Sequence, residues 1–160
     1  ADSGQLVIEP QWIDMASWLR QQTEHWQRLA PTHRIEMEWA FDDKGAQLYG
    51  DEQRLTQVIA ILVNNAVKYS DPNTRVMVKA SQSATDFRIS VIDQGPGISP
   101  SDLPYIFERF VRINRSIEGS GLGLAIARTI AEAHHGELSV DSVVGRGSTF
   151  TLTLPREPQP

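Results

Sequence analysis

Several segments of this chain alternate apolar and polar residues one by one, and this alternation limits the possible fold more than any other feature. Residues 34–39 read Arg-Ile-Glu-Met-Glu-Trp, so their apolar side chains fall on one face of a strand. The same period of two is present in 76–80, 87–91 and 150–154. Strands of this kind bury one face only, whereas the strands of a doubly wound sheet are apolar on both faces. The pattern therefore predicts a sheet that is covered on a single side.

Segments with a helical period lie between these strands. The first helix is expected to begin after Asp14, which can cap it, and to end before Pro31. A second helix is expected at 51–69 and a third at 122–134. Their predicted apolar faces are Met15, Trp18, Leu19, Gln22, Trp26 and Leu29, then Leu55, Ile59, Leu62, Val63 and Ala66, then Leu122, Ile126, Ile130 and Ala133. Helices interleaved with half-buried strands predict an α/β (α+β) fold, a two-layer sandwich of a mixed sheet with helices on one face.

The remaining segments carry weaker patterns. Residues 6–13 are expected to form an extended lead-in, and 44–49 to pair with 34–39 across a turn. A short helix is expected around 103–110, and a further strand at 137–141.

Length and composition bound the classes of function. The 160 residues suit one domain, which we assign to 1–155, followed by a flexible proline-rich tail at 156–160. The net charge of -5 gives no support to nucleic-acid binding, and the absence of cysteine excludes a disulfide framework. No apolar run reaches the roughly 18 residues of a membrane span, and the start shows no signal-peptide pattern. We expect a cytoplasmic domain, with an inner-membrane anchor left open for a longer parent protein.

The first motif with chemical meaning is Asp-Gln-Gly-Pro-Gly-Ile at 93–98, directly after a predicted strand. A carboxylate in this place can accept a hydrogen bond from an exocyclic amine, while the glycines let the backbone approach a flat ring. Taken alone, the same residues also suit an ordinary tight turn.

The second motif is Gly-Ser-Gly-Leu-Gly-Leu at 119–124, at the start of a predicted helix. Glycines there leave backbone N–H groups free to face phosphate oxygens. The spacing differs from the dinucleotide fingerprint, and no lysine follows to make a P-loop, so the motif alone is weak.

The third motif lies on the helix at 51–69. Asn65, Lys68 and Tyr69 share one flank beside the apolar stripe. An amide oxygen can ligate Mg²⁺, a lysine can meet phosphate and a tyrosine can cover a base, although a solvated helix edge would have the same composition.

The order of these motifs is more specific than any one of them. Asn-Ala-Val-Lys-Tyr-Ser at 65–70, the motif at 93–98, Phe-Glu-Arg-Phe at 107–110, the motif at 119–124 and Gly-Arg-Gly-Ser-Thr-Phe at 145–150 follow one another along the chain. Together they resemble the N box, glycine boxes and F box of the ATP-binding domain of sensor histidine kinases. The resemblance implies the Bergerat-type fold that gyrase B, Hsp90 and MutL share.

The resemblance implies a site for ATP and Mg²⁺. Asp93 would bind the adenine amino group, and Thr149 would support the same contact through water. The base pocket would be completed by Gly95, Gly97 and Ile98, with Tyr69 packed on the ring. Asn65 would be the Mg²⁺ ligand, which suits an ion that takes few protein ligands.

The phosphates would be held from the other side. Lys68 and Arg112 would neutralise their charge, as cations do in phosphoryl transfer. Residues 111–121 would form a mobile lid over the nucleotide, because they lack apolar anchors. The lid and the helix after it would close on the triphosphate through Gly119, Gly121, Gly123 and the N–H groups near Leu122 and Leu124.

Two places depart from the family pattern. Ile61 stands one helical turn before Asn65, where histidine kinases usually have Asn and the related ATPases a water-activating Glu; Asn64 points about 100° away from Asn65 and is not expected to substitute. His134 and His135 precede Gly136 where the family shows His-Gly-Gly, and we interpret them as a helix C-terminus favoured by the dipole rather than as a metal site.

The predicted function is transfer of the ATP γ-phosphate to a histidine on a separate dimerisation domain of the parent protein, with a response regulator downstream. No catalytic residue is assigned within this chain, because none of its four histidines has the context of a phosphoacceptor. The alternatives are a degenerate nucleotide-sensing module, which Ile61 favours, and a relative of the anti-sigma-factor serine kinases. A gyrase-type or chaperone-type ATPase is excluded, since Ile61 cannot activate water.

Overall fold

Five strands form one mixed sheet in the computed structural model, which describes residues 6–40, 46–108 and 122–157. The strand order is β2-β4-β5-β7-β6. The bounds are β2 (Arg34–Ala40), β4 (Arg75–Gln82), β5 (Asp86–Ile92), β6 (Glu137–Val143) and β7 (Gly147–Pro155). β2 and β4 run parallel, and each other neighbouring pair is antiparallel.

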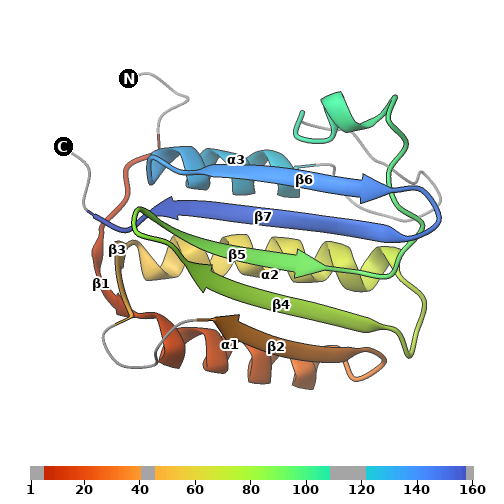
Figure 1. The fold of residues 1–160 in the computed structure, drawn as a ribbon, viewed down its shortest axis with the longest axis horizontal. Coiled ribbons are helices and arrows are strands. Elements are labelled where there is room, and N and C mark those ends of the chain that lie inside the picture. The colour runs from red at the N-terminus through yellow and green to blue at the C-terminus, as the bar shows by residue number, and fades with distance from the viewer. Residues whose placement is uncertain (1–5, 41–45, 109–121, 158–160) are drawn as a thin grey trace.

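The helices α1 (Met15–Leu29), α2 (Glu52–Tyr69) and α3 (Gly123–Ala133) lie together behind this sheet in Figure 1. Two aspartates begin the first two helices. The side chain of Asp14 accepts a hydrogen bond from the Ser17 N–H (3.3 Å), and that of Asp51 accepts one from the Arg54 N–H (3.2 Å). The cap at Asp14 and the bounds of both helices follow the sequence predictions closely.

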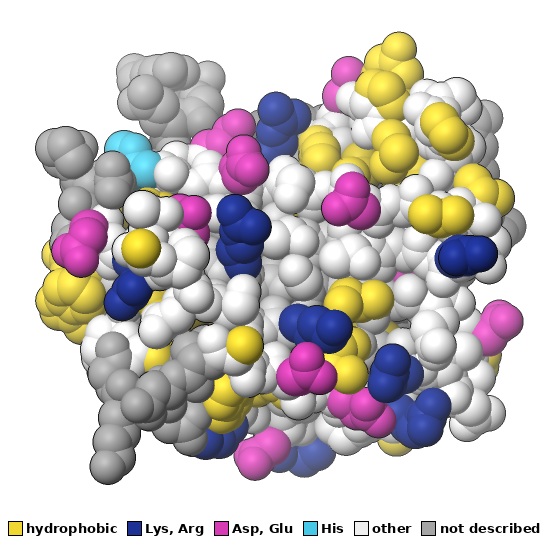
Figure 2. Space-filling model, viewed as in Figure 1, with side chains coloured by type: hydrophobic (Ala, Val, Ile, Leu, Met, Phe, Trp, Pro, Cys, Tyr) yellow, Lys and Arg dark blue, Asp and Glu magenta, His cyan; other side chains and the backbone are white. Residues whose placement is uncertain are grey.

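The other face of the sheet is open and carries charged side chains of both signs (Figure 2). On it, Arg75 lies 3.6 Å from Glu36, and Lys79 lies 4.0 Å from Glu38, which joins β4 to β2 across the sheet. The predicted two-layer sandwich, with helices on one face of a mixed sheet, is confirmed.

The hydrophobic core fills the space between the two layers. It takes every second residue of the central strands and the inner stripe of each helix. The largest fully buried side chains are Phe87, Met15, Leu19, Leu48, Leu55, Ile59, Leu62, Ile89, Ile106, Ile130, Leu152 and Leu154.

The predicted pairing of 44–49 with 34–39 is wrong. β3 (Gln47–Gly50) instead pairs antiparallel with β1 (Gln11–Asp14), in a separate two-stranded sheet. Ile13 lies opposite Leu48 in this pair, and both side chains are buried. Alternation shows that a segment is a strand but does not select its partner. Residues 11–14 of the expected lead-in pair with β3 instead, and their buried Ile13 packs beside Leu48.

Three smaller expectations also fail. On α3 the predicted core residue Ile126 is 39% exposed, because the buried face of that helix is formed by Leu124, Ala127, Ile130 and Ala131. Leu29 is 60% exposed at the end of α1, because the core contacts of that helix are concentrated in its first turns. The helix expected around 103–110 is a single 3₁₀ turn, Leu103–Tyr105, as far as the structure describes this segment. In the part of the chain that is described, no helix combines the length and the apolar character needed to cross a membrane.

Candidate nucleotide-binding site

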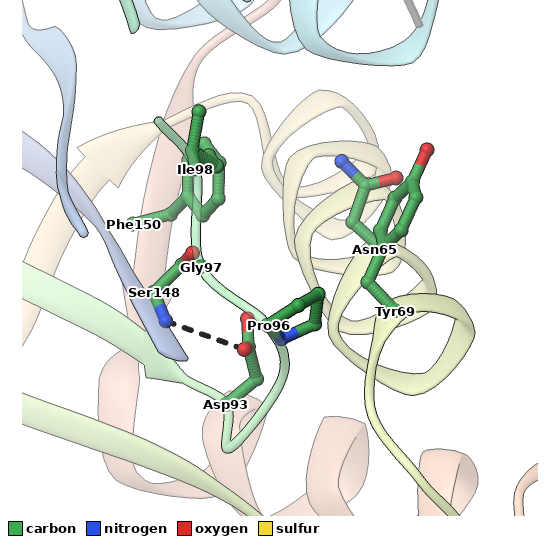
Figure 3. Close-up of a pocket in the computed structure, with 8 residues that line it drawn as sticks. All are labelled: Asn65, Tyr69, Asp93, Pro96, Gly97, Ile98, Ser148 and Phe150. Atoms are coloured by element: carbon green, nitrogen blue, oxygen red, sulfur yellow. Dashed lines mark hydrogen bonds between the residues drawn. The ribbon is translucent and has the colours of Figure 1, made fainter. Parts of the chain in front are cut away.

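A pocket opens where the second half of α2 faces the segment after β5 and the beginning of β7 (Figure 3). It is largely apolar, with one buried acid on its wall. Its lining residues are Asn65, Tyr69, Asp93, Pro96, Gly97, Ile98, Ser148 and Phe150. Three of the sequence motifs, far apart in the chain, therefore meet at one place.

Asp93 is the acid of this pocket, and only 8% of the residue is exposed. Its Oδ1 accepts hydrogen bonds from the Gly95 N–H (2.8 Å) and the Ser148 N–H (3.3 Å). Burial raises the pKa of the carboxyl above its ordinary value, and these two N–H groups only partly oppose that rise. No described residue hydrogen-bonds to Oδ2, so one acceptor oxygen of Asp93 remains for a ligand in the pocket.

The glycines beside Asp93 allow close backbone approaches. A side-chain Cβ at Gly95 would lie 2.6 Å from the carbonyl oxygen of Tyr69. At Gly147, which has φ +129°, a Cβ would lie 2.0 Å from the carbonyl oxygen of Asp93. Both distances are too short for any side chain. The 93–98 segment bends at Gly95, and the two glycines let it lie directly against α2 and β7.

The α2 motif divides between pocket and solvent. Asn65 and Tyr69 lie one helical turn apart and both line the pocket, as Figure 3 shows. Asn64 and Lys68 are exposed, and neither lines the pocket. Asn64 therefore does not replace the missing polar residue at position 61. Lys68 stands at the rim of the site rather than within it.

Thr149 does not lie where the sequence analysis placed it. Adjacent residues of a strand point to opposite faces, and in β7 it is Ser148 and Phe150 that are buried on the pocket side. Ser148 is also the residue whose N–H reaches Asp93. Ser148, and not Thr149, is therefore the residue of β7 that lines the pocket beside Asp93. The alternation of Phe150, Leu152 and Leu154 already contained this signal, since it puts Ser148 and not Thr149 in phase with the core.

Phe107 belongs to the wall behind the pocket. Its ring meets that of Phe150 edge to face, with centroids 6.3 Å apart. The guanidinium of Arg128 on α3 lies 5.7 Å from the Phe107 centroid. The beginning of the Phe-Glu-Arg-Phe motif is therefore a packing element that connects the pocket wall to α3.

The first turn of α3 packs on α2 through Ile61. A Cβ at Gly123 would lie 3.2 Å from Ile61 Cγ2, so a side chain there would require the Ile61 side chain to shift by a few tenths of an ångström. Leu124 is buried in the core, and Leu122 is half-buried. Among the residues predicted to bind phosphate, Arg112, Gly119 and Gly121 lie outside the described residues, as does the predicted lid at 111–121.

His134 and His135 end α3 in different ways. The Nδ1–H of the buried His134 donates to the carbonyl of Ile130 (2.8 Å), while its Nε2 accepts from the Asp51 N–H (3.0 Å). This pairing requires a neutral ring, and burial accordingly lowers the pKa of His134. The expected charge–dipole role is therefore wrong for His134, whose ring instead joins α3 to the start of α2. His135 is exposed and has φ +60°, the left-handed position that usually holds glycine.

The comparisons with known proteins agree with this geometry. A family model described as "Histidine kinase-, DNA gyrase B-, and HSP90-like ATPase" matches residues 50–158. The chain belongs to this family. It is thus an ATPase domain that carries the fold and the boxes of the histidine kinase branch.

Its relatives point to that branch. The chain is 33% identical over 161 residues to the sensor histidine kinase CusS of Escherichia coli K12, covering 97% of this chain and 32% of CusS. It is 41% identical over 120 residues to the sensor-like histidine kinase SenX3 of Mycolicibacterium smegmatis, covering 72% of this chain and 31% of SenX3. The chain spans about a third of the length of these curated relatives.

Solved structures extend the similarity to the fold. The mycobacterial sensor histidine kinase MprB superposes with a TM-score of 0.80 at 31% identity, covering 94% of this chain and all of that one. Full-length ShkA in complex with AMPPNP gives a TM-score of 0.81 at 32% identity, covering 96% of this chain and 32% of ShkA. These relatives do not favour the anti-sigma-factor or nucleotide-sensing alternatives.

The residues present fit ATP. A buried carboxylate can only accept hydrogen bonds, which suits the amino group of adenine and not the keto oxygen of guanine. The apolar side chains of Ile98 and Phe150 suit a flat ring, and Asn65 on α2 offers an amide oxygen to the pocket. No group of three or more His, Cys, Asp or Glu residues in the described ranges is placed to hold a metal ion. A Mg²⁺ site here would thus draw on Asn65 and on phosphate oxygens.

Proposed function

We propose that this domain binds Mg²⁺-ATP and transfers the γ-phosphoryl group to a histidine on a dimerisation domain of its parent protein, which then serves a response regulator. The observation that carries the proposal is the buried carboxylate of Asp93, whose Oδ2 has no hydrogen-bond partner among the described residues, in a pocket that α2 closes with Asn65 and Tyr69. We place the domain in the cytoplasm, where ATP is available.

Each part of the pocket has one task in this proposal. Asp93 accepts the adenine amino group and Ser148 supports that contact from β7. Tyr69 covers the ring, and Asn65 holds Mg²⁺ through its amide oxygen. Lys68 at the rim, with Arg112 and the glycines at 119–123, neutralises and surrounds the phosphates. Mg²⁺-ATP supplies the phosphoryl group, so the domain itself needs only to bind and orient the nucleotide and to exclude water.

The chemical step needs no base from this chain. A nitrogen of the partner's imidazole forms the bond to phosphorus as the bond to the bridging oxygen of ADP breaks, and the imidazole proton leaves to an acidic neighbour or to water. Ile61 has neither a lone pair nor a proton with which to activate a competing water. The domain is therefore suited to transfer to a partner and poorly suited to hydrolysis.

The test is transfer of ³²P from labelled ATP to a separately produced histidine-bearing domain of the same parent. Wild type should label that domain with acid-labile phosphate, and Asn65→Ala should lower the rate at least about tenfold, since contacts to charged groups are worth about 1.5–3 kcal/mol. Asn64→Ala is the matched control, because Asn64 is the adjacent exposed amide outside the pocket. The chain alone should not label itself. If ATP binds but wild type and Asn65→Ala transfer equally poorly, the domain is a nucleotide-sensing module and the proposal fails.

A further inference from the structure

The β6–β7 hairpin is bound to the segment that carries Asp93. The Gly145 N–H donates to the carbonyl of Pro96 (2.8 Å), and the Asp93 N–H donates to the carbonyl of Ser148 (2.9 Å). At Gly97, which has φ +78°, a Cβ would lie 2.3 Å from the carbonyl oxygen of Val143. The hairpin and the 93–98 segment therefore form one closely fitted unit around the base end of the pocket.

A single hydroxyl lies at the centre of this unit. Ser142 Oγ accepts a hydrogen bond from the Ile98 N–H (2.7 Å) and lies 2.8 Å from Ser148 Oγ. The same oxygen lies 3.1 Å from the carbonyl of Gly147. Ile98 and Ser148 both line the pocket, whereas Ser142 does not. Ser142 thus connects two walls of the pocket without being available to touch a ligand directly.

The chemistry of this position requires a hydroxyl. A serine has one proton to donate and two lone pairs to accept with, so Ser142 can accept from Ile98 and still bond to Ser148. When Ser142 donates to the Gly147 carbonyl, it accepts a hydrogen bond from Ser148, so the Ser148 proton points to Ser142 and not into the pocket. When Ser142 instead donates to Ser148, the proton of Ser148 is free for the pocket. Adenine presents an amine that donates and a ring nitrogen that accepts, so a free Ser148 proton beside the acceptor Asp93 complements its edge.

We propose that Ser142 is a positioning residue for base recognition: it holds Ile98 and Ser148 in place and lets the Ser148 hydroxyl act as a donor next to Asp93. The inference rests on the proposed ATP site and adds a determinant of adenine specificity. Without the hydroxyl, the Ile98 N–H loses its partner and the Ser148 hydroxyl loses the neighbour that orients its proton toward the pocket. Both changes affect the base end of the pocket and leave the phosphate end untouched.

The experiment measures the dissociation constants of Mg²⁺-ATP and Mg²⁺-GTP by calorimetry for wild type, Ser142→Ala and Ser142→Thr. Ser139→Ala is the matched control, since Ser139 lies on the same strand, is exposed and faces the other side of the sheet. Wild type and Ser139→Ala should prefer ATP by the same ratio. Ser142→Ala should lower that ratio about tenfold, which corresponds to about 1.4 kcal/mol, and Ser142→Thr should restore it within about twofold.

The ratio separates a positioning role from a structural one. A variant that is merely less folded loses active protein for both nucleotides equally, so its ratio stays at the wild-type value. An unchanged ratio in Ser142→Ala, or a folded Ser142→Thr that does not restore it, overturns the inference. If Ser142→Ala does not fold, Ser142→Cys replaces it, because a thiol of similar size is a poor donor and acceptor. Failure of wild type to bind ATP would instead overturn the proposed function.

Discussion

Replacing Asp93 with asparagine changes one atom of the site and keeps its shape. The hydrogen bonds from the Gly95 N–H and the Ser148 N–H both end on Oδ1, and the amide oxygen of an asparagine can accept them in the same place. The second oxygen, which no described residue engages, becomes an NH₂ group that donates instead of accepting. The substitution therefore reverses the polarity of the pocket at the point where adenine would bind, without leaving a cavity.

The size of the effect follows from the lost contact. A hydrogen bond to a charged group contributes about 1.5–3 kcal/mol, and its loss should weaken ATP binding by roughly 10- to 150-fold. Asp93→Ala should lose at least as much. The NH₂ group of Asp93→Asn faces two donors on adenine's amine but could donate to the keto oxygen of guanine. GTP affinity should therefore fall less than ATP affinity, and the preference for ATP should narrow.

The same change should make the fold more stable at neutral pH. The pKa of Asp93 is raised in the folded protein because the carboxyl is buried, so its contribution to stability is fully present below the unfolded pKa of about 3.8 and is lost as pH rises through the folded pKa. At pH 7 the buried charge is a cost that asparagine removes. Binding and stability are thus expected to change in opposite directions.

Calorimetric titration with ATP and GTP, together with thermal unfolding at pH 7, checks both halves of this prediction. Asp141→Asn is the matched control, since Asp141 is exposed on β6 and should change neither quantity. An Asp93→Asn variant that binds ATP within about twofold of wild type would refute the assignment of Asp93 to the base. A lower melting temperature would refute the account of its burial.

Two predictions concern the end of α3. His135→Gly should raise the free energy of unfolding, measured by chemical denaturation, by about 0.5–1 kcal/mol. The reason is that relief of the left-handed strain at φ +60° outweighs the greater freedom of glycine in the unfolded chain. His135→Ala keeps the strain and should show no gain. The pKa of His134 in the folded protein lies below its ordinary 6.5, mainly because the ring is buried. As pH drops, the unfolded chain therefore binds a proton at this residue before the folded protein does. The free energy of unfolding should fall below about pH 6.5, by at most about 1.4 kcal/mol per pH unit. The unfolding free energy between pH 8 and pH 5 should lose this slope in His134→Gln; an equal slope in both proteins would contradict the neutral ring bridging Asp51 and Ile130.

The fold was largely accessible from the sequence because local patterns determined it. The residues 76–80 and 87–91 alternate so regularly that their burial follows from a period of two, and Asp14 marks the beginning of α1 by its capping chemistry. The partner of β3 was not accessible. Pairing joins segments that are far apart in the chain, and the lead-in at 11–14 shows no pattern that distinguishes it from any other short strand.

Only some of the residues that line the pocket could be predicted from the sequence. The predicted Asp93, Asn65 and Tyr69 do meet in one pocket, although their roles toward a ligand stay proposals. Ser148 was missed in favour of Thr149, since position within a motif was followed instead of strand phase. Ser142 could not be found from the sequence at all, because its contacts with Ile98 and Ser148 depend on how the hairpin closes on the 93–98 segment.

Ile61 shows that a departure from a family pattern can have a structural meaning as well as a chemical one. Its side chain is half-buried on α2 and meets the place where Gly123 begins α3, so an apolar contact joins the two helices. A polar residue at position 61 would offer a lone pair between α2 and α3, whereas the isoleucine side chain makes this helix contact apolar and excludes water from it. The N–H groups of that first turn are the ones expected to face phosphate. In our proposal the same side chain therefore supports the phosphate end of the site and withholds the group that hydrolysis would need. Both effects favour a domain that keeps its phosphoryl group for a partner.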